Sequence, residues 1–125
     1  MILTEPLGPD TLAVNVSGTV GAADVGRTFD VIHAMPGDAK VNLLITVADD
    51  LAPAWREALA AEWHRRSEVV SLVRRAGRIA VVAPQAWIRI AARVESALMP
   101  GLHYEVFAPE QAAAARAHVM GSLGD

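Results

Sequence analysis

The 125-residue chain contains no cysteine, which excludes disulfides, thiolate metal sites and cysteine nucleophiles. Aromatic residues make up only 5% of the sequence, and three of them are tryptophans. No apolar stretch reaches the roughly 18 residues that a membrane-spanning helix needs. The first ten residues have neither the basic region nor the apolar core of a signal peptide. Together these features predict a cytoplasmic protein without a transmembrane segment.

Basic residues are also in the minority, with 11 lysines and arginines against 14 acids and a formal net charge of −3. Proteins that bind duplex nucleic acid usually carry a basic excess, so we do not expect nucleic acid as a partner. Hydrophobic residues, in contrast, account for 53% of the chain. This composition and length predict one folded domain over residues 1–125 with a single core.

The apolar pattern predicts the element order ββαβαβα. Alternation of apolar with small or polar residues indicates strands, and apolar residues three or four apart indicate helices. Asp24 is the expected N-cap of the first helix. The expected elements are strands over 2–5 and 11–17, a helix over 24–35, a strand in "KVNLLITVADD", a helical stretch over 53–75, a strand in "RIAVVAP", a helix from Pro84, a strand in "LHYEVFA" and a helix from Pro109 to about Met120.

These elements form a mixed α/β sheet of five strands with helices packed against it. Strand–helix–strand units cross over with a right hand, so the last three strands are expected to be parallel. The first two strands pair in antiparallel fashion through their tight turn. The segment from Ile79 is apolar at every position, which is typical of a strand inside the sheet with both faces covered.

Several short motifs resemble the bacterial SpoIIAA-like proteins, small domains related in fold to the STAS domains of anti-sigma-factor antagonists. These are "SGTV" followed by "AAD", Trp63 sixteen residues before Ile79, then "RIAVV", "WIR" and "LMPG". The resemblance covers nearly the whole chain and implies a STAS-like fold, no cofactor, no catalytic activity and a homodimer. In the antagonists, a serine near the start of the helix after the third strand is phosphorylated. The matching stretch here, "ADDLAPAW", has no serine or threonine, which argues against that switch.

The tryptophans are the first candidates for a binding site. Residues eight apart on a helix lie on the same side, so Trp55 and Trp63 share a face. Large aromatics line apolar ligand pockets and interfaces, but they also dominate ordinary cores, and we favour core packing. The pocket hypothesis comprises Trp55, Leu59, Trp63, Trp87 and Met99.

The charged candidates are two acids and two arginines. Asp49 and Asp50 end a strand, where paired carboxylates bind ions or act as bases, although a helix-capping role for Asp50 is simpler. Arg66 and Arg89 are candidate anion ligands, since guanidinium groups bind phosphates and carboxylates in bidentate fashion. Solvated helix faces explain these arginines more simply, and we favour that interpretation.

No metal or catalytic motif is present in the sequence. The four histidines, His33, His64, His103 and His118, are scattered without metal-ligand spacing. The sequence therefore predicts a non-enzymatic domain that binds a protein partner or an apolar small molecule, such as a lipid, through tryptophan-bearing helices. The alternative is a small cofactor-independent enzyme whose apolar pocket uses Asp49, Asp50 or His103.

Overall fold

The computed structural model describes residues 1–35, 40–52, 76–84 and 103–120. Five strands, two α-helices and a short 3₁₀ helix lie in these ranges. In chain order they are β1 (Ile2–Gly8), β2 (Thr11–Val16), α1 (Ala22–Ala34), β3 (Val41–Val47), β4 (Ala76–Val82), β5 (His103–Phe107), the 3₁₀ helix Pro109–Gln111 and α5 (Ala112–Met120). The predicted helices over 53–75 and after Pro84 lie outside the described residues.

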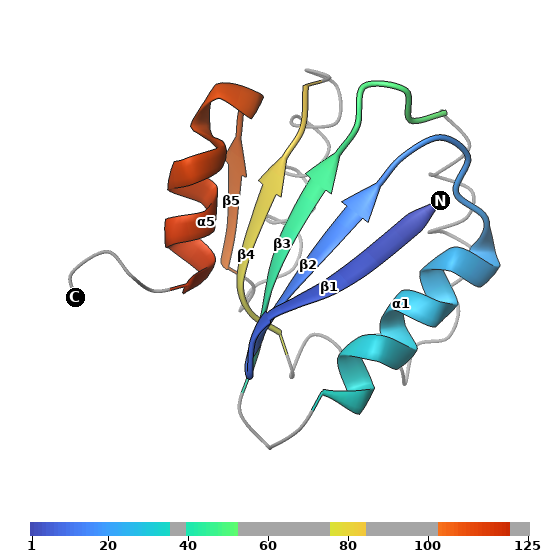
Figure 1. Cartoon of the computed structure of the whole chain (residues 1–125), viewed down its shortest axis with the longest axis horizontal. Coiled ribbons are helices and arrows are strands. Elements are labelled where there is room, and N and C mark those ends of the chain that lie inside the picture. Colours follow the sequence, from blue (N-terminus) through green and yellow to red (C-terminus); the bar gives the residue numbers. More distant parts are fainter. Residues whose placement is uncertain (36–39, 53–75, 85–102, 121–125) are drawn as a thin grey trace.

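The strands form one mixed sheet in the order β1-β2-β3-β4-β5, as Figure 1 shows. β1 is antiparallel to β2, and every later neighbouring pair is parallel. The predicted α/β fold is therefore confirmed, and the parallel set also includes β2. This follows from the same right-handed crossover rule, because α1 joins β2 to β3 as a strand–helix–strand unit.

One face of the sheet packs against α1. Val25, Phe29 and Ile32 recur at the three- and four-residue spacing of a helix and are all buried. Each such side chain contributes about 1.5–3 kcal/mol when it leaves water. They meet the alternate apolar residues of the strands, which on β2, β3 and β4 include Leu12, Val14, Val41, Leu43, Ile79 and Val81.

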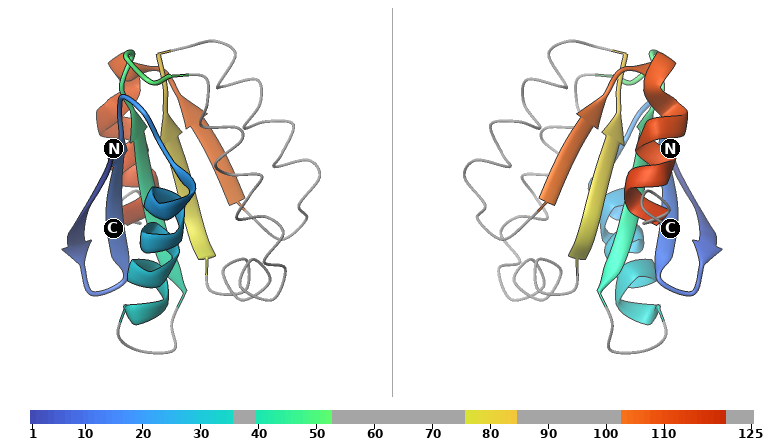
Figure 2. Two further views of the ribbon diagram at one scale, coloured as in Figure 1. Left: turned by 90° about the vertical axis from the view of Figure 1, so that its right-hand side faces the viewer. Right: turned by 90° about the vertical axis from the view of Figure 1, so that its left-hand side faces the viewer.

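The opposite face packs against α5, so that the two helices lie on opposite sides of the sheet (Figure 2). Ala115 and Val119 of α5 are fully buried and contact Ala80 and Val82 of β4. The predicted position of the Ile79 segment inside the sheet is thus confirmed. β4 has parallel neighbours on both edges, and its residues are buried in the cores on both faces, which explains its uninterrupted apolar sequence.

The start of α1 differs from the prediction. The N-cap is Gly21, and Asp24 is the third helical residue, whose carboxylate accepts a hydrogen bond from the Gly21 N–H at 2.9 Å. Asp24 still satisfies a free donor at the helix start, as a cap does, but from inside the helix.

Two strands begin or end elsewhere than the sequence suggests. β1 continues through Pro6 to Gly8, with an irregularity between Pro6 and Gly8. β4 begins at Ala76 and carries a bulge, because two steps along β3 match three along β4. At this bulge the Asn42 side-chain oxygen accepts a hydrogen bond from the Arg78 N–H at 2.8 Å.

His118 of α5 packs beside Phe107 of β5, with ring centroids 6.1 Å apart. Its Nε2 atom is buried and has no hydrogen-bond partner in the described part of the chain. Neither of the described α-helices has the length and hydropathy needed to cross a membrane.

Candidate functional site

The loops that follow β2 and β3 lie side by side at one edge of the sheet. β2 ends at Val16, β3 ends at Val47, and these two residues are partners in the parallel register. We call residues 17–21 and 48–52 the carboxyl edge. Open α/β sheets commonly bind ligands and partners at this edge, because loops there converge from several strands.

Backbone and side-chain hydrogen bonds join the two loops. The Ala48 N–H donates to the Val16 carbonyl at 2.8 Å, and the Ala52 N–H donates to the Gly18 carbonyl, also at 2.8 Å. In addition, the Gly18 N–H donates to Oδ1 of Asp50 at 3.2 Å. Gly18 has a φ angle of 59°, a conformation that glycine adopts without steric cost. The two loops are therefore held in one arrangement.

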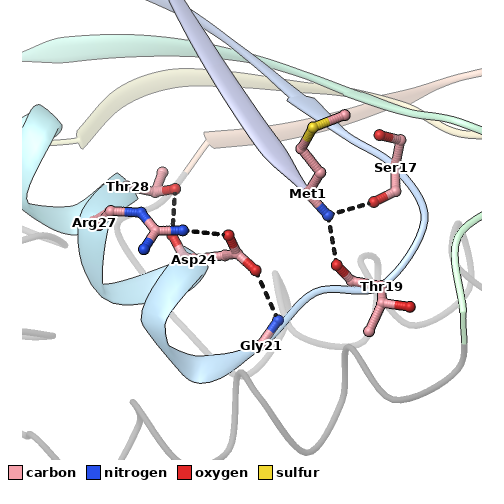
Figure 3. A network of polar contacts seen from close by, with 7 residues as sticks. All are labelled: Met1, Ser17, Thr19, Gly21, Asp24, Arg27 and Thr28. Atoms are coloured by element: carbon pink, nitrogen blue, oxygen red, sulfur yellow. Dashed lines mark hydrogen bonds and ion pairs between the residues drawn. The ribbon is translucent and has the colours of Figure 1, made fainter.

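The N-terminus is attached to the same edge, as Figure 3 shows. The α-ammonium group of Met1 donates to the carbonyl oxygens of Ser17 at 2.6 Å and Thr19 at 2.5 Å. The Ser17 N–H donates in return to the Met1 carbonyl at 2.9 Å. These bonds restrain the first half of the β2–α1 loop, and Gly18 lies between the two restrained residues.

The second half of this loop is held by Asp24 (Figure 3). One carboxylate oxygen accepts the Gly21 N–H, and the other forms an ion pair with Arg27 at 2.5 Å. The backbone hydrogen bond from Gly21, together with the positive charge of Arg27, lowers the pKa of Asp24 below its ordinary value. Asp24 is therefore fully ionised at neutral pH and fixes the first turn of α1.

The predicted acidic pair lies at the carboxyl edge. Asp49 and Asp50 form the exposed turn after β3. Asp50 uses one oxygen to join the loops. No group of three or more histidines, aspartates or glutamates suited to a metal ion occurs in the described residues.

The histidine of the enzyme hypothesis lies at the other end of the sheet. His103 begins β5 and pairs with Arg78 near the start of β4, whereas the acids follow the end of β3. The four residue-to-residue steps from Arg78 to Val82 alone span about 13 Å. The backbone therefore places the start of β5 and the turn with Asp49 and Asp50 at opposite ends of the sheet, and the enzyme hypothesis stays a prediction.

Most other candidates lie outside the described residues. These are the pocket residues and the two arginines, namely Trp55, Leu59, Trp63, Trp87, Met99, Arg66 and Arg89. The pocket hypothesis and the anion hypothesis stay predictions.

Sequence reasoning missed the bond between Gly18 and Asp50. Its two partners are 32 residues apart, and no local pattern relates them. The available signals are a glycine two residues after one strand and an acid three residues after the neighbouring strand. Parallel strand ends meet at one edge, so these signals point to proximity without specifying the contact.

A mixed sheet with an antiparallel outer strand, crossover connections and helices on both faces defines a STAS-like α/β domain. The SpoIIAA-like family model matches residues 11–119, and the chain belongs to this family. A solved structure from Shewanella loihica PV-4, an uncharacterised protein of the DUF3478 family with a SpoIIAA-like fold, is similar with a TM-score of 0.59 and 20% identity. The match covers 91% of this chain and 90% of that one. A search of curated proteins finds no significant match.

Proposed function

We propose that this chain is a non-enzymatic binding domain that recognises a protein partner through its carboxyl edge. The observation that carries the proposal is the pair of loops joined by the Gly18–Asp50 and Gly18–Ala52 hydrogen bonds. Loops that are ordered before binding lose little conformational entropy when a partner docks, which favours affinity. Membership in the SpoIIAA-like family supports a binding or regulatory role.

The exposed groups of the carboxyl edge suit a polar protein surface. Thr19, Asp49 and Asp50 are exposed there. The chain also continues from Ala52 and Pro84 into the two segments that carry the tryptophans. We therefore keep an apolar small molecule or lipid, bound by the tryptophan-bearing segments, as a second ligand class. A cytoplasmic location and a homodimer belong to the same proposal.

Site-specific photo-crosslinking tests the protein-partner proposal. A photoreactive benzoylphenylalanine is placed at Thr19 or Asp49 on the carboxyl edge, and at Asp10 or Lys40 on the opposite edge as matched controls. All four side chains are exposed. In intact cells we expect one discrete adduct with a different protein from the first pair and none from the second.

The second part of this experiment uses a variant in which the hydrogen bond between the two loops is removed. Asp50→Ala removes the bond to Gly18 and should reduce the adduct formed from Thr19, whereas Asp10→Ala should not. Adducts of equal yield from both edges would contradict the proposal. The same holds if the adducts from Thr19 and Asp49 contain only copies of this chain and no different protein.

The apolar-ligand class has its own readout. Titration with the dye 1-anilinonaphthalene-8-sulfonate, or with phosphatidylcholine vesicles, should quench or shift tryptophan fluorescence in a saturable manner. A strictly linear response shows that no apolar site exists in the tryptophan-bearing segments.

A further inference from the structure

The outer strand β1 has backbone groups without partners in the described part of the chain. The Ser17 N–H and the Met1 carbonyl are hydrogen-bonded, so Met1 and Ser17 form a hydrogen-bonded pair of the antiparallel ladder. Such pairs alternate, and the register therefore directs the N–H and C=O groups of Leu3 and Glu5 toward β2. The corresponding groups of Ile2, Thr4 and Pro6 point away from the sheet.

An independent hydrogen bond supports this alternation. The carbonyl of Val16 accepts a hydrogen bond from the Ala48 N–H on the β3 side. The backbone N–H and C=O groups of the even-numbered residues of β2 therefore point toward β3. The N–H and C=O groups of the odd-numbered residues of β2 consequently point toward β1. Pro6, which has no N–H, lies at an outward-facing position, where proline is tolerated in an edge strand.

The exposed apolar side chains gather at this strand. Of the three large hydrophobic residues exposed in the described ranges, Met1 and Leu3 lie at or in β1, at 54% and 56% exposure. The third, Met120, ends α5. Ile2 packs against the α1 core, so Leu3 projects from the opposite face of the sheet. An edge strand with free backbone groups and an exposed leucine is a template for another strand.

We propose that β1 pairs in antiparallel fashion with β1 of a second copy of this chain, with Leu3 on the two-fold axis. Ile2 and Thr4 of each copy then exchange both backbone hydrogen bonds with Thr4 and Ile2 of the other copy. The five-stranded sheet continues across the axis into its copy. This inference rests on the homodimer of the proposed function and names its interface, which is a different surface from the carboxyl edge.

Pro6 selects this register over its nearest alternative. If the two-fold axis passed through Thr4 instead, Pro6 would lie opposite Ile2 of the other copy. Because proline has no N–H, the Ile2 carbonyl would then receive no hydrogen bond. With the axis at Leu3, the paired segment runs from Met1 to Glu5, and Pro6 lies just beyond it. Every outward N–H and C=O group of the paired segment then has a partner.

The side chains are self-complementary in the same register. The two Leu3 residues form a non-hydrogen-bonded pair, the closer type, and shield each other from water. Glu5, the only charged residue of β1, lies opposite Met1 of the other copy. The two Glu5 carboxylates are therefore far apart, and no like charges meet across the axis. A second copy thus provides partners for the outward backbone groups, covers the exposed leucine and brings no like charges together.

Disulfide trapping tests the interface directly, because the chain contains no cysteine and any introduced thiol is the only one. In the proposed register the Cα atoms of the two Leu3 residues are about 4.5 Å apart, within the range that a disulfide bridges. The two Thr4 residues are about 8 Å apart, which is too far. Leu3 is exposed, so Leu3→Cys should fold normally.

We expect oxidation to convert Leu3→Cys into a covalent dimer much faster than Thr4→Cys. At micromolar protein the rate should exceed that of Met120→Cys, a control for random collisions, by on the order of 100-fold, because paired thiols have a millimolar effective concentration. Faster crosslinking of Thr4→Cys, or equal rates for Leu3→Cys and Met120→Cys, overturns the proposal.

Amide hydrogen exchange of the unmodified chain provides a second measurement. The Leu3 and Glu5 amides should be protected at every concentration, because they bond to β2. The Ile2 and Thr4 amides should gain protection as the concentration rises, in step with a doubled mass in sedimentation equilibrium. Protection of Ile2 and Thr4 in a monomer indicates another occupant, such as an extended peptide, and overturns the proposal.

Discussion

The backbone of Gly77 in β4 lies very close to the side chain of Asn42 in β3. A Cβ atom at Gly77 would overlap the Asn42 side-chain oxygen and lie 3.3 Å from the Cβ of Lys40. The same oxygen accepts the Arg78 N–H at the β4 bulge. Glycine is thus required here by the close approach of a neighbouring strand, which is a common reason for glycine inside a strand.

We expect Gly77→Ala to lower the free energy of unfolding by about 1–3 kcal/mol, the usual cost of overpacking a tight site. Urea unfolding followed by circular dichroism measures the change. Gly8→Ala is the matched control, because a Cβ atom at Gly8 meets nothing within 4 Å. A combined Gly77→Ala, Asn42→Ala variant should be less destabilised than the sum of the single changes. Strict additivity would show that the two residues do not interact.

Asp24 gives the stability of the domain a dependence on acid pH. Its pKa is lowered in the folded chain from an ordinary 3.8, so the ionised form stabilises the fold fully at pH values well above 3.8. That contribution is lost as the pH falls through 3.8 and then through the lower pKa of the folded state.

Asp24→Asn retains a side-chain oxygen that can accept the Gly21 N–H but removes the charge. The variant should be less stable than the wild type at pH 7, and the difference should shrink toward pH 2. Chemical denaturation across this range measures it. Asp30→Asn, which alters an exposed acid of the same helix, is the control. A difference that stays constant with pH would exclude the ion pair and the charged hydrogen bond as its cause.

Some of the helices and strands can be predicted from the sequence pattern alone. β3 and β4 are recognisable because strands covered on both faces need apolar residues at nearly every position. The buried face of α1 follows from the spacing of Val25, Phe29 and Ile32. The N-cap was assigned to Asp24 because aspartate is a common capping residue, whereas Gly21 forms the turn and Asp24 bonds back to it.

Other features depend on contacts between distant segments. β1 extends past Pro6 because the backbone nitrogen of this proline, which cannot donate a hydrogen bond, points away from β2. The sequence does not reveal which edge of a strand is free. Likewise, the acids after β3 were recognisable as candidates, but the partner of Asp50 was not. Gly18 becomes its neighbour only when β2 and β3 pair in their observed register.

Where α5 packs on β5, the buried Nε2 atom of His118 has no hydrogen-bond partner among the residues that the structure describes. Burying such an atom costs roughly 1–3 kcal/mol. His118→Leu should therefore leave the domain as stable as the wild type or more stable, despite the loss of the ring contact with Phe107. His118→Gln, which keeps a polar end, should be less stable than the leucine variant. Thermal unfolding at pH 8 compares them, and a leucine variant that is the least stable of the three would contradict this expectation.

The whole molecule is organised around strands that belong to both layers of packing. β3 and β4 contribute alternate residues to the core on the α1 side and to the core on the α5 side. If these strands separate, the side chains of both cores are therefore exposed to solvent. This shared sheet is the physical reason to expect one cooperative unit, as the prediction of a single domain over residues 1–125 requires.

Unfolding should accordingly follow one transition by two independent probes. Far-ultraviolet circular dichroism follows the sheet and helices, and tryptophan fluorescence follows the segments that carry Trp55, Trp63 and Trp87. We expect the two curves to coincide in urea. Separate midpoints would show that the tryptophan-bearing segments unfold independently of the sheet and would contradict the single-unit prediction.

The antiparallel pairing of β1 with β2 has a consequence for the order in which the chain acquires its structure. These strands are joined by a two-residue turn, whereas α1 separates β2 from β3 and longer segments separate the later strands. Short-range pairings form fast, and pairings between distant segments form slowly because a long loop must first be closed. The hairpin is thus positioned to act as an early template, and the successive parallel strands set the overall rate of folding.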